Sequence, residues 1–228
     1  MKLLTLFGLM SSLLLTAGTP FTHSNNASVS SIPNEIGSNT KPETTATVSY
    51  RLDAGQSKFM VRTFSGGLLW FKGHDHLVAI RDFTGEARVT PGTITPASLQ
   101  LRIRADSLEE TRDVFTEQQK QIINKEIREI VLETAKYPEI TFLSGVVNGQ
   151  MEGPVFKAHI GGDLTMHGVT HRLEIPADVT LVGNDLRARG EFSVKRSDYK
   201  VNATSAAKGT VRVRDKLEFT FDIVGHRR

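Results

Sequence analysis

The chain has 228 residues, of which 23% are charged, with a formal net charge of +3 and no cysteine. The lack of cysteine excludes disulfides, thiolate metal sites, cysteine nucleophiles and lipid attachment to cysteine. Basic and acidic residues are interleaved, which argues against a nucleic-acid groove, because such a groove needs a clustered basic face.

The N-terminal segment predicts export. Lys2 precedes an apolar run, which ends in the small residues Thr16, Ala17 and Gly18. This order is typical of a signal peptide over residues 1–18. An uncleaved anchor is the alternative, although the run is short for a membrane span of about 20 residues. Residues 19–47 are rich in Ser, Thr, Asn and Pro, which predicts a disordered linker. We therefore expect a folded domain over 48–228, located in the periplasm or secreted.

From Val48 onward, apolar residues alternate with charged or polar ones. Period-two patterning predicts strands with one buried face, and these are antiparallel, because buried parallel strands form unbroken apolar runs. Roughly eight to ten such segments predict an all-β sandwich or a small closed barrel. The segments are separated by turn signals at Asp53–Gly55, Pro91–Gly92, Asn148–Gly149, Gly153–Pro154 and Gly183–Asp185.

One segment, residues 109–134, breaks this period and is almost free of Gly and Pro. Ser107 and Glu110 have the spacing of a capping box, and Pro138 ends whatever precedes it. The pattern predicts one long helix over Thr111–Thr134 that packs on the barrel and covers an opening. Its apolar stripe has helical spacing and consists of Val114, Ile123, Ile127, Ile130 and Val131.

Histidines suggest a second kind of site. In a strand, His74 and His76 would share one face, and His167 and His171 flank a predicted turn. A metal site needs a third ligand that the sequence does not identify; alternatively, these rings hydrogen-bond backbone groups at strand ends. A G-x-S-x-G nucleophile motif and a paired acid and base are both missing. We therefore predict no enzyme, no metal and no cofactor, and keep a histidine-based metal or haem-binding protein as the alternative.

Bulky apolar residues are distributed over many of the predicted strands. They either fill a core or line a channel for one apolar ligand, as in lipocalins, and the pattern leaves both open. Strand parity and bulk nominate the residues of such a channel, and His74, His76 and His167 are the candidates for holding a ligand head group. The nominated channel residues are Phe59, Trp70, Phe71, Phe83, Leu101, Ile103, Phe142, Leu164, Met166, Phe192, Phe219 and Phe221.

Several short motifs occur in order along the domain. They are YRLD at Tyr50–Asp53, FTGEA at Phe83–Ala87, YPEITF at Tyr137–Phe142, LTMHGVT at Leu164–Thr170 and KRSDY at Lys195–Tyr199. With these motifs, the chain from Val48 to about Gly225 resembles the YceI-like family of bacterial periplasmic lipid-binding proteins. Lys200 departs from the family pattern, where many members carry Gly. The GHDH segment at Gly73–His76 lies in a variable region, so its role is not inherited.

The resemblance implies an extended antiparallel β-barrel, similar in idea to lipocalins, with a long apolar tunnel. It implies non-enzymatic binding, transport or sequestration of a long-chain lipid in the periplasm, of the polyisoprenoid, isoprenoid quinone or fatty amide type. We expect no nucleic-acid partner and no stable membrane insertion after signal cleavage. Exposed strand edges or the helix would support a homodimer.

Overall fold

The computed structural model describes residues 46–67, 73–206 and 211–228. The predicted signal peptide and nearly all of the predicted linker lie outside these residues. The described part contains one α-helix, α1 (Glu117–Glu126), followed by a π-helical turn at Ile127–Val131. Its strands are β1 (Val48–Gly66), β2 (His76–Ile80), β3 (Phe83–Thr90), β4 (Ile94–Arg104), β5 (Leu108–Glu110), β6 (Glu139–Glu152), β7 (Val155–Met166), β8 (Val169–Val182), β9 (Asp185–Lys195), β10 (Ser205–Ala206) and β11 (Val211–Arg227).

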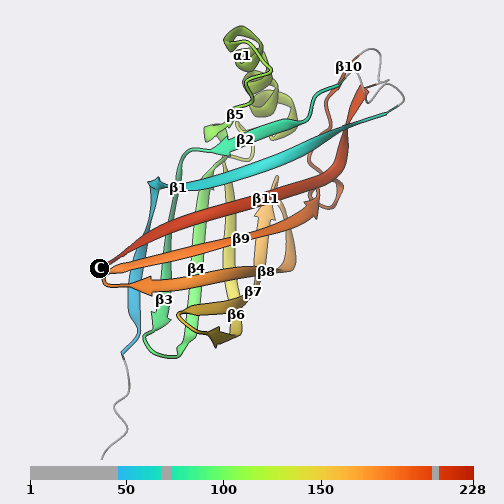
Figure 1. The fold of residues 1–228 in the computed structure, drawn as a ribbon. Coiled ribbons are helices and arrows are strands. Elements are labelled where there is room, and N and C mark those ends of the chain that lie inside the picture. Colours follow the sequence, from blue (N-terminus) through green and yellow to red (C-terminus); the bar gives the residue numbers. More distant parts are fainter. Residues whose placement is uncertain (1–45, 68–72, 207–210) are drawn as a thin grey trace, which may run out of the picture. The chain divides into compact units, whose positions relative to one another are not determined.

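Eight of these strands form a closed antiparallel barrel in the order β1-β3-β4-β6-β7-β8-β9-β11, because β11 pairs again with β1. The pairing of β1 with β11 extends from Tyr50↔Arg227 to Gly66↔Arg212. Along β1, β3 pairs with the first residues and β2 with residues near the other end. Figure 1 shows these long strands wrapping around one interior, with α1 beyond one end. The prediction of an all-β antiparallel barrel with one helix is therefore confirmed, and the sandwich is excluded.

Two predicted turns are wrong. β1 continues through Asp53–Gly55, where a bulge relative to β11 replaces the turn. The Asp53 carboxylate accepts hydrogen bonds from the backbone amides of Gly55 (2.8 Å) and Gln56 (3.2 Å), so the turn-forming side chain stabilises the bulge instead. Asn148–Gly149 likewise lies inside β6. The turn signals at Pro91–Gly92 and Gly153–Pro154 lie between strands, and Gly183–Asp185 contains the turn before β9, which begins at Asp185.

The helix is shorter than predicted and begins later. Ser107 and Glu110 do not form a capping box, because Leu108–Glu110 pairs with β2 as strand β5. The capping box forms instead at Thr116, whose hydroxyl accepts from the Gln119 amide at 3.3 Å, while the Gln119 side chain accepts from the Thr116 amide at 2.8 Å. Thr116 and Gln119 have the S/T-x-x-Q spacing of a capping box. The pairing of β5 with β2 prevents Ser107 and Glu110 from forming one, so the helix begins after Thr116.

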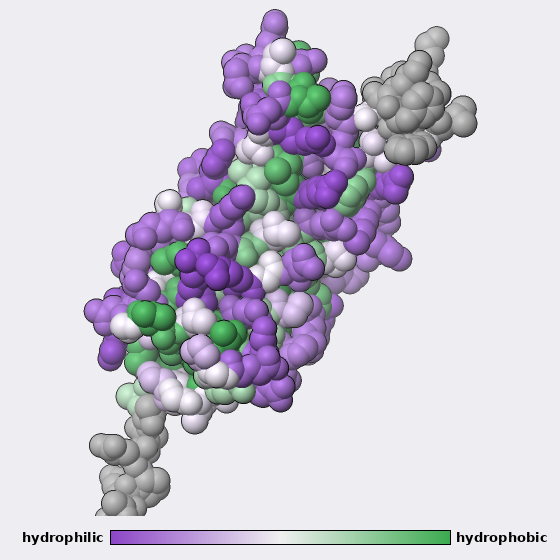
Figure 2. Space-filling view, viewed as in Figure 1, coloured by the Kyte–Doolittle hydropathy of each residue, from purple (hydrophilic) through white to green (hydrophobic). Residues whose placement is uncertain are grey.

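The helical segment directs only part of its predicted apolar stripe inward. Ile123, Ile127 and Val131 line the barrel interior. Val114 and Ile130 are 47% and 49% exposed, so they lie on the surface. The outer face in Figure 2 is mainly hydrophilic, with scattered apolar patches, one of them on the helical segment. Within the described ranges, no helix is long and apolar enough to cross a membrane.

Candidate functional site: an apolar cavity with one polar end

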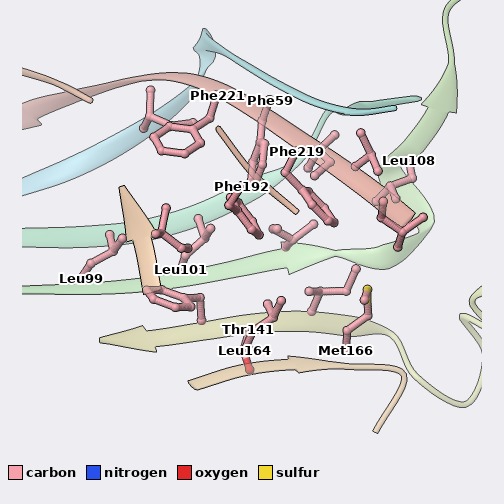
Figure 3. A pocket seen from close by; sticks show the side chains of 18 of the residues that line it. Phe59, Leu99, Leu101, Leu108, Thr141, Leu164, Met166, Phe192, Phe219 and Phe221 are labelled. Carbon is pink, nitrogen blue, oxygen red and sulfur yellow. The ribbon is translucent and has the colours of Figure 1, made fainter. Parts of the chain in front are cut away.

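The barrel encloses a cavity of about 240 Å³. Its wall is formed by inward side chains of the barrel strands. The helical segment adds Ile123, Ile127, Val131 and Leu132 to the lining. Figure 3 shows aliphatic and aromatic groups converging on this space from facing strands. An apolar cavity of roughly 150 Å³ stays dry and accepts a benzene-sized molecule. This larger cavity can therefore hold a hydrocarbon chain.

Four phenylalanines form one side of the cavity. Phe192 and Phe219 are stacked, with ring centroids 4.7 Å apart and an interplanar angle of 6°. Phe59 lies 6.3 Å from Phe219 and meets Phe221 edge-on at 6.2 Å. These rings come from β1, β9 and β11, which are neighbours in the barrel, and Figure 3 shows them together. The cross-strand cluster gives a rigid aromatic surface for an apolar ligand.

The structure places most of the nominated channel residues on this wall. Phe83 is the exception among the described ones: it is 4% exposed and packs edge-on against Phe59, a residue of the wall, at 6.2 Å. Trp70 and Phe71 lie outside the described residues. Those that line the cavity are Phe59, Leu101, Ile103, Phe142, Leu164, Met166, Phe192, Phe219 and Phe221.

One end of the cavity, near the helical segment, is polar. A row of paired residues crosses four adjacent strands at this end. His76 on β2 pairs with Thr63 on β1. Thr63 pairs with Leu217 on β11, which in turn pairs with Val194 on β9. Arg196 follows two residues after Val194. We call this region the helix end. Its polar lining residues are Thr63, His76, Glu126, Arg196, Asn202 and Thr204. Thr63 follows Phe59 and Val61 at alternate positions of β1, so the period-two pattern could have identified it as an inward residue. Arg196 comes after the end of β9, where no period-two pattern applies.

His76 is oriented by a buried carboxylate. Its Nδ1 lies 2.7 Å from Oε2 of Glu110, whose side chain is fully buried. Burial raises the pKa of this carboxyl, but hydrogen bonds from His76 and from the backbone amides of Arg112 and Leu77 outweigh it, so the pKa lies below its usual value. An ionised carboxylate only accepts, so His76 Nδ1 donates the proton. Phe115 stacks on the His76 ring at 5.3 Å.

The other two nominated histidines do not line the cavity. The His74 ring meets Phe115 edge-on at 5.7 Å. His167 lies in the β7–β8 turn, and its Nε2 is 2.7 Å from Oε2 of Glu133, beyond the π-helical turn. Asn202 donates to the same Glu133 oxygen at 3.2 Å. His167 therefore ties the helical segment to the barrel. The described residues hold no group of three His, Asp or Glu side chains placed to bind a metal ion.

Comparison with known proteins identifies the family. A model of the YceI-like domain matches residues 50–225, most of the chain. This chain belongs to the YceI-like family. Its barrel and inward-facing apolar strands are thus those of a YceI-like domain. No curated protein sequence matches the chain.

Solved structures show the same fold. BcnA from Burkholderia cenocepacia matches with a TM-score of 0.59 at 20% identity, covering 76% of this chain and 98% of that one. A polyisoprenoid-binding domain from Saccharophagus degradans, implicated in plant cell wall breakdown, matches at 0.56 and 17%, covering 79% and 99%. The YceI protein of Campylobacter jejuni matches at 0.52 and 17%, covering 66% and 84%. At identities of 17–20%, this similarity establishes a shared fold only.

Proposed function

We propose that this protein binds a long-chain apolar lipid inside its barrel, without chemical change, and that it does so in the periplasm after export. The apolar cavity of about 240 Å³ inside the barrel carries this proposal. Burial of each methylene group in such a space contributes about 0.8 kcal/mol. Membership of the YceI-like family and the fold shared with a polyisoprenoid-binding domain support a ligand of the polyisoprenoid, isoprenoid quinone or fatty amide type.

The polar groups of the cavity are not paired for catalysis. It contains one oriented imidazole, His76, but Thr63 Oγ1 has no hydrogen-bond partner in the part of the chain that the structure describes. A nucleophile needs an adjacent base within hydrogen-bonding distance. The site is thus built to enclose a chain and to hold one end of it, which suits a carrier or a sequestering protein.

Native mass spectrometry of the exported protein, followed by denaturing mass spectrometry of the released ligand, tests the proposal. We expect a discrete long-chain adduct. Ala188 lines the cavity, so Ala188→Phe should fill the space and remove the adduct. Val182 is 74% exposed on β8, so Val182→Phe is the matched control and should keep it. Repeated recovery of lipid-free wild-type protein that takes up no isoprenoid quinone would refute the proposal.

A further inference from the structure

The cavity contains polar atoms that lack partners. Within the described ranges, three buried side-chain nitrogen or oxygen atoms make no hydrogen bond: Thr63 Oγ1, His167 Nδ1 and Arg196 Nε. Two of these atoms, on Thr63 and Arg196, belong to residues that line the cavity. A buried donor without a partner is unfavourable and rare in folded proteins. Its occurrence in the wall of a binding cavity therefore indicates that a ligand supplies the missing acceptor.

Both atoms lie at the helix end. The row His76–Thr63–Leu217–Val194 crosses four adjacent strands, and Arg196 begins the 3-10 turn after β9. Arg196 Nη1 donates to the carbonyl of Val201 at 2.9 Å. This bond fixes the guanidinium while leaving its Nε–H without a hydrogen bond.

The donors select the chemistry of the ligand. The guanidinium of Arg196 only donates and stays charged, and its planar fork matches carboxylate and phosphate oxygens. The hydroxyl of Thr63 adds a second donor, since it rotates to suit its partner. Charge-assisted hydrogen bonds to an oxyanion are stronger than those to a neutral oxygen. The helix end is thus suited to an oxyanion.

Two carboxylates lie near this end, and neither takes the place of the ligand. Asp215 Oδ1 is 3.9 Å from Arg196 Nε, too far for a hydrogen bond. Asp215 instead accepts from the Ser197 hydroxyl (2.7 Å) and amide (3.0 Å). The Ser197 hydroxyl bond is the largest contribution that keeps the Asp215 pKa below its usual value. Glu126 also lines the cavity, but it makes no ion pair with Arg196 in the part of the chain that the structure describes.

We propose that the ligand is a long-chain amphiphile with an oxyanion head group, a phosphate or a carboxylate, and that Arg196 and Thr63 bind this head group at the helix end. The chain then extends past the phenylalanine cluster toward Leu99, Val147 and Phe156, which line the cavity on β4, β6 and β7. This inference rests on the proposed function and names the class of its ligand.

Calorimetric titration of the lipid-free full chain with farnesyl phosphate and with farnesol tests this inference, because the two probes share one chain. We expect wild-type protein to bind farnesyl phosphate at least about tenfold more tightly than farnesol. Arg196→Gln should abolish this preference while retaining farnesol binding. Thr63→Val should reduce it and leave the melting temperature unchanged or higher, since the lost hydroxyl has no partner within the described ranges. Palmitate and hexadecanol repeat the comparison for a carboxylate.

Arg172→Gln is the matched control, because Arg172 is exposed and pairs with Asp163 on the barrel surface. It should leave the preference unchanged. If Arg196→Gln unfolds through loss of the Val201 bond, Thr63→Val decides the outcome. Two results would overturn this inference but not the proposed function. One is that wild-type protein binds both members of each probe pair with equal affinity. The other is that the preference for the charged probe survives these substitutions. Failure to bind any of the four probes overturns the proposed function as well.

Discussion

Substitution of Glu110 should separate the stability of the helix end from the orientation of its histidine. The carboxylate accepts from His76 Nδ1 at 2.7 Å and, through its other oxygen, from the backbone amides of Leu77 (3.3 Å), Thr111 (3.0 Å) and Arg112 (2.9 Å). Glu110→Ala leaves all four donors without this acceptor. Leaving buried donors unsatisfied costs about 1–3 kcal/mol for each donor that finds no other acceptor. We therefore expect a total loss of about 3–5 kcal/mol, which corresponds to a fall in melting temperature of about 6–20 °C.

Glu110→Gln should cost much less, about 1–2 kcal/mol. The amide oxygen can still accept from the three backbone amides, while its NH₂ group faces His76 Nδ1. That nitrogen must then accept, so the proton moves to Nε2 of the ring. Nitrogen NMR of the labelled histidine should therefore report Nδ1–H in wild-type protein and Nε2–H in Glu110→Gln.

Thermal unfolding of both variants checks the magnitudes. Glu109→Ala on the neighbouring residue is the control, because Glu109 is half exposed and its pair with Arg81 spans 3.4 Å, so the loss should stay below about 1 kcal/mol. The folded-state pKa of Glu110 is lowered. Its stabilisation is therefore present above the ordinary carboxyl pKa and is lost as pH falls through the lowered value. A Glu110→Ala protein that melts with wild type near pH 7, or a Gln variant as unstable as the Ala variant, would refute this reasoning.

Two further perturbations probe the wall and the outer face of the barrel. Phe59→Ala should destabilise the lipid-free protein by about 3–5 kcal/mol, because Phe59 contacts three other rings; no change in urea midpoint would contradict the packing. Asp222 accepts from Arg187 and Arg189, and the Arg187 bonds contribute most to a pKa of about 2. Since the arginines are about half exposed, Asp222→Asn should cost only about 1 kcal/mol at pH 7. This loss of stability should vanish as pH falls toward 2 and should be smaller in high salt. A loss of stability that does not depend on pH would exclude the ion pair as its cause.

The barrel was predictable because each strand carries its own signal. In β11, Leu217, Phe219 and Ile223 are buried and alternate with polar residues, so burial follows parity from one residue to the next. The same parity placed Leu101 and Ile103 on the cavity wall. Parity also predicts that Phe83 is buried, as it is. However, parity tells which face a side chain occupies and not how far the cavity extends, so it could not show that Phe83 lies outside the lining.

The helix shows where local signals compete. Ser107 and Thr116 both begin a capping-box pattern, and local sequence does not rank them. The choice depends on Glu110, whose burial against His76 and pairing with Val78 of β2 hold residues 108–110 in a strand. This contact joins residues more than thirty positions apart, so it could not be inferred from the helical segment itself. The role of Arg196 was not predictable for a similar reason, because the position of its guanidinium depends on a hydrogen bond to the Val201 carbonyl, outside the strand.

Whether the barrel interior is open or filled depends on the positions of small residues in the wall beneath the large side chains. A Cβ at Gly190 would approach the Phe221 ring to 2.6 Å, and one at Gly162 would approach the Phe142 ring to 2.5 Å. These rings therefore lie against the barrel wall over glycines, instead of projecting fully across the interior. Ala158 adds a short side chain to the lining. The aromatic surplus in the sequence was compatible with either a filled or a hollow barrel, and the placement of these glycines beneath the rings is what leaves room for a ligand.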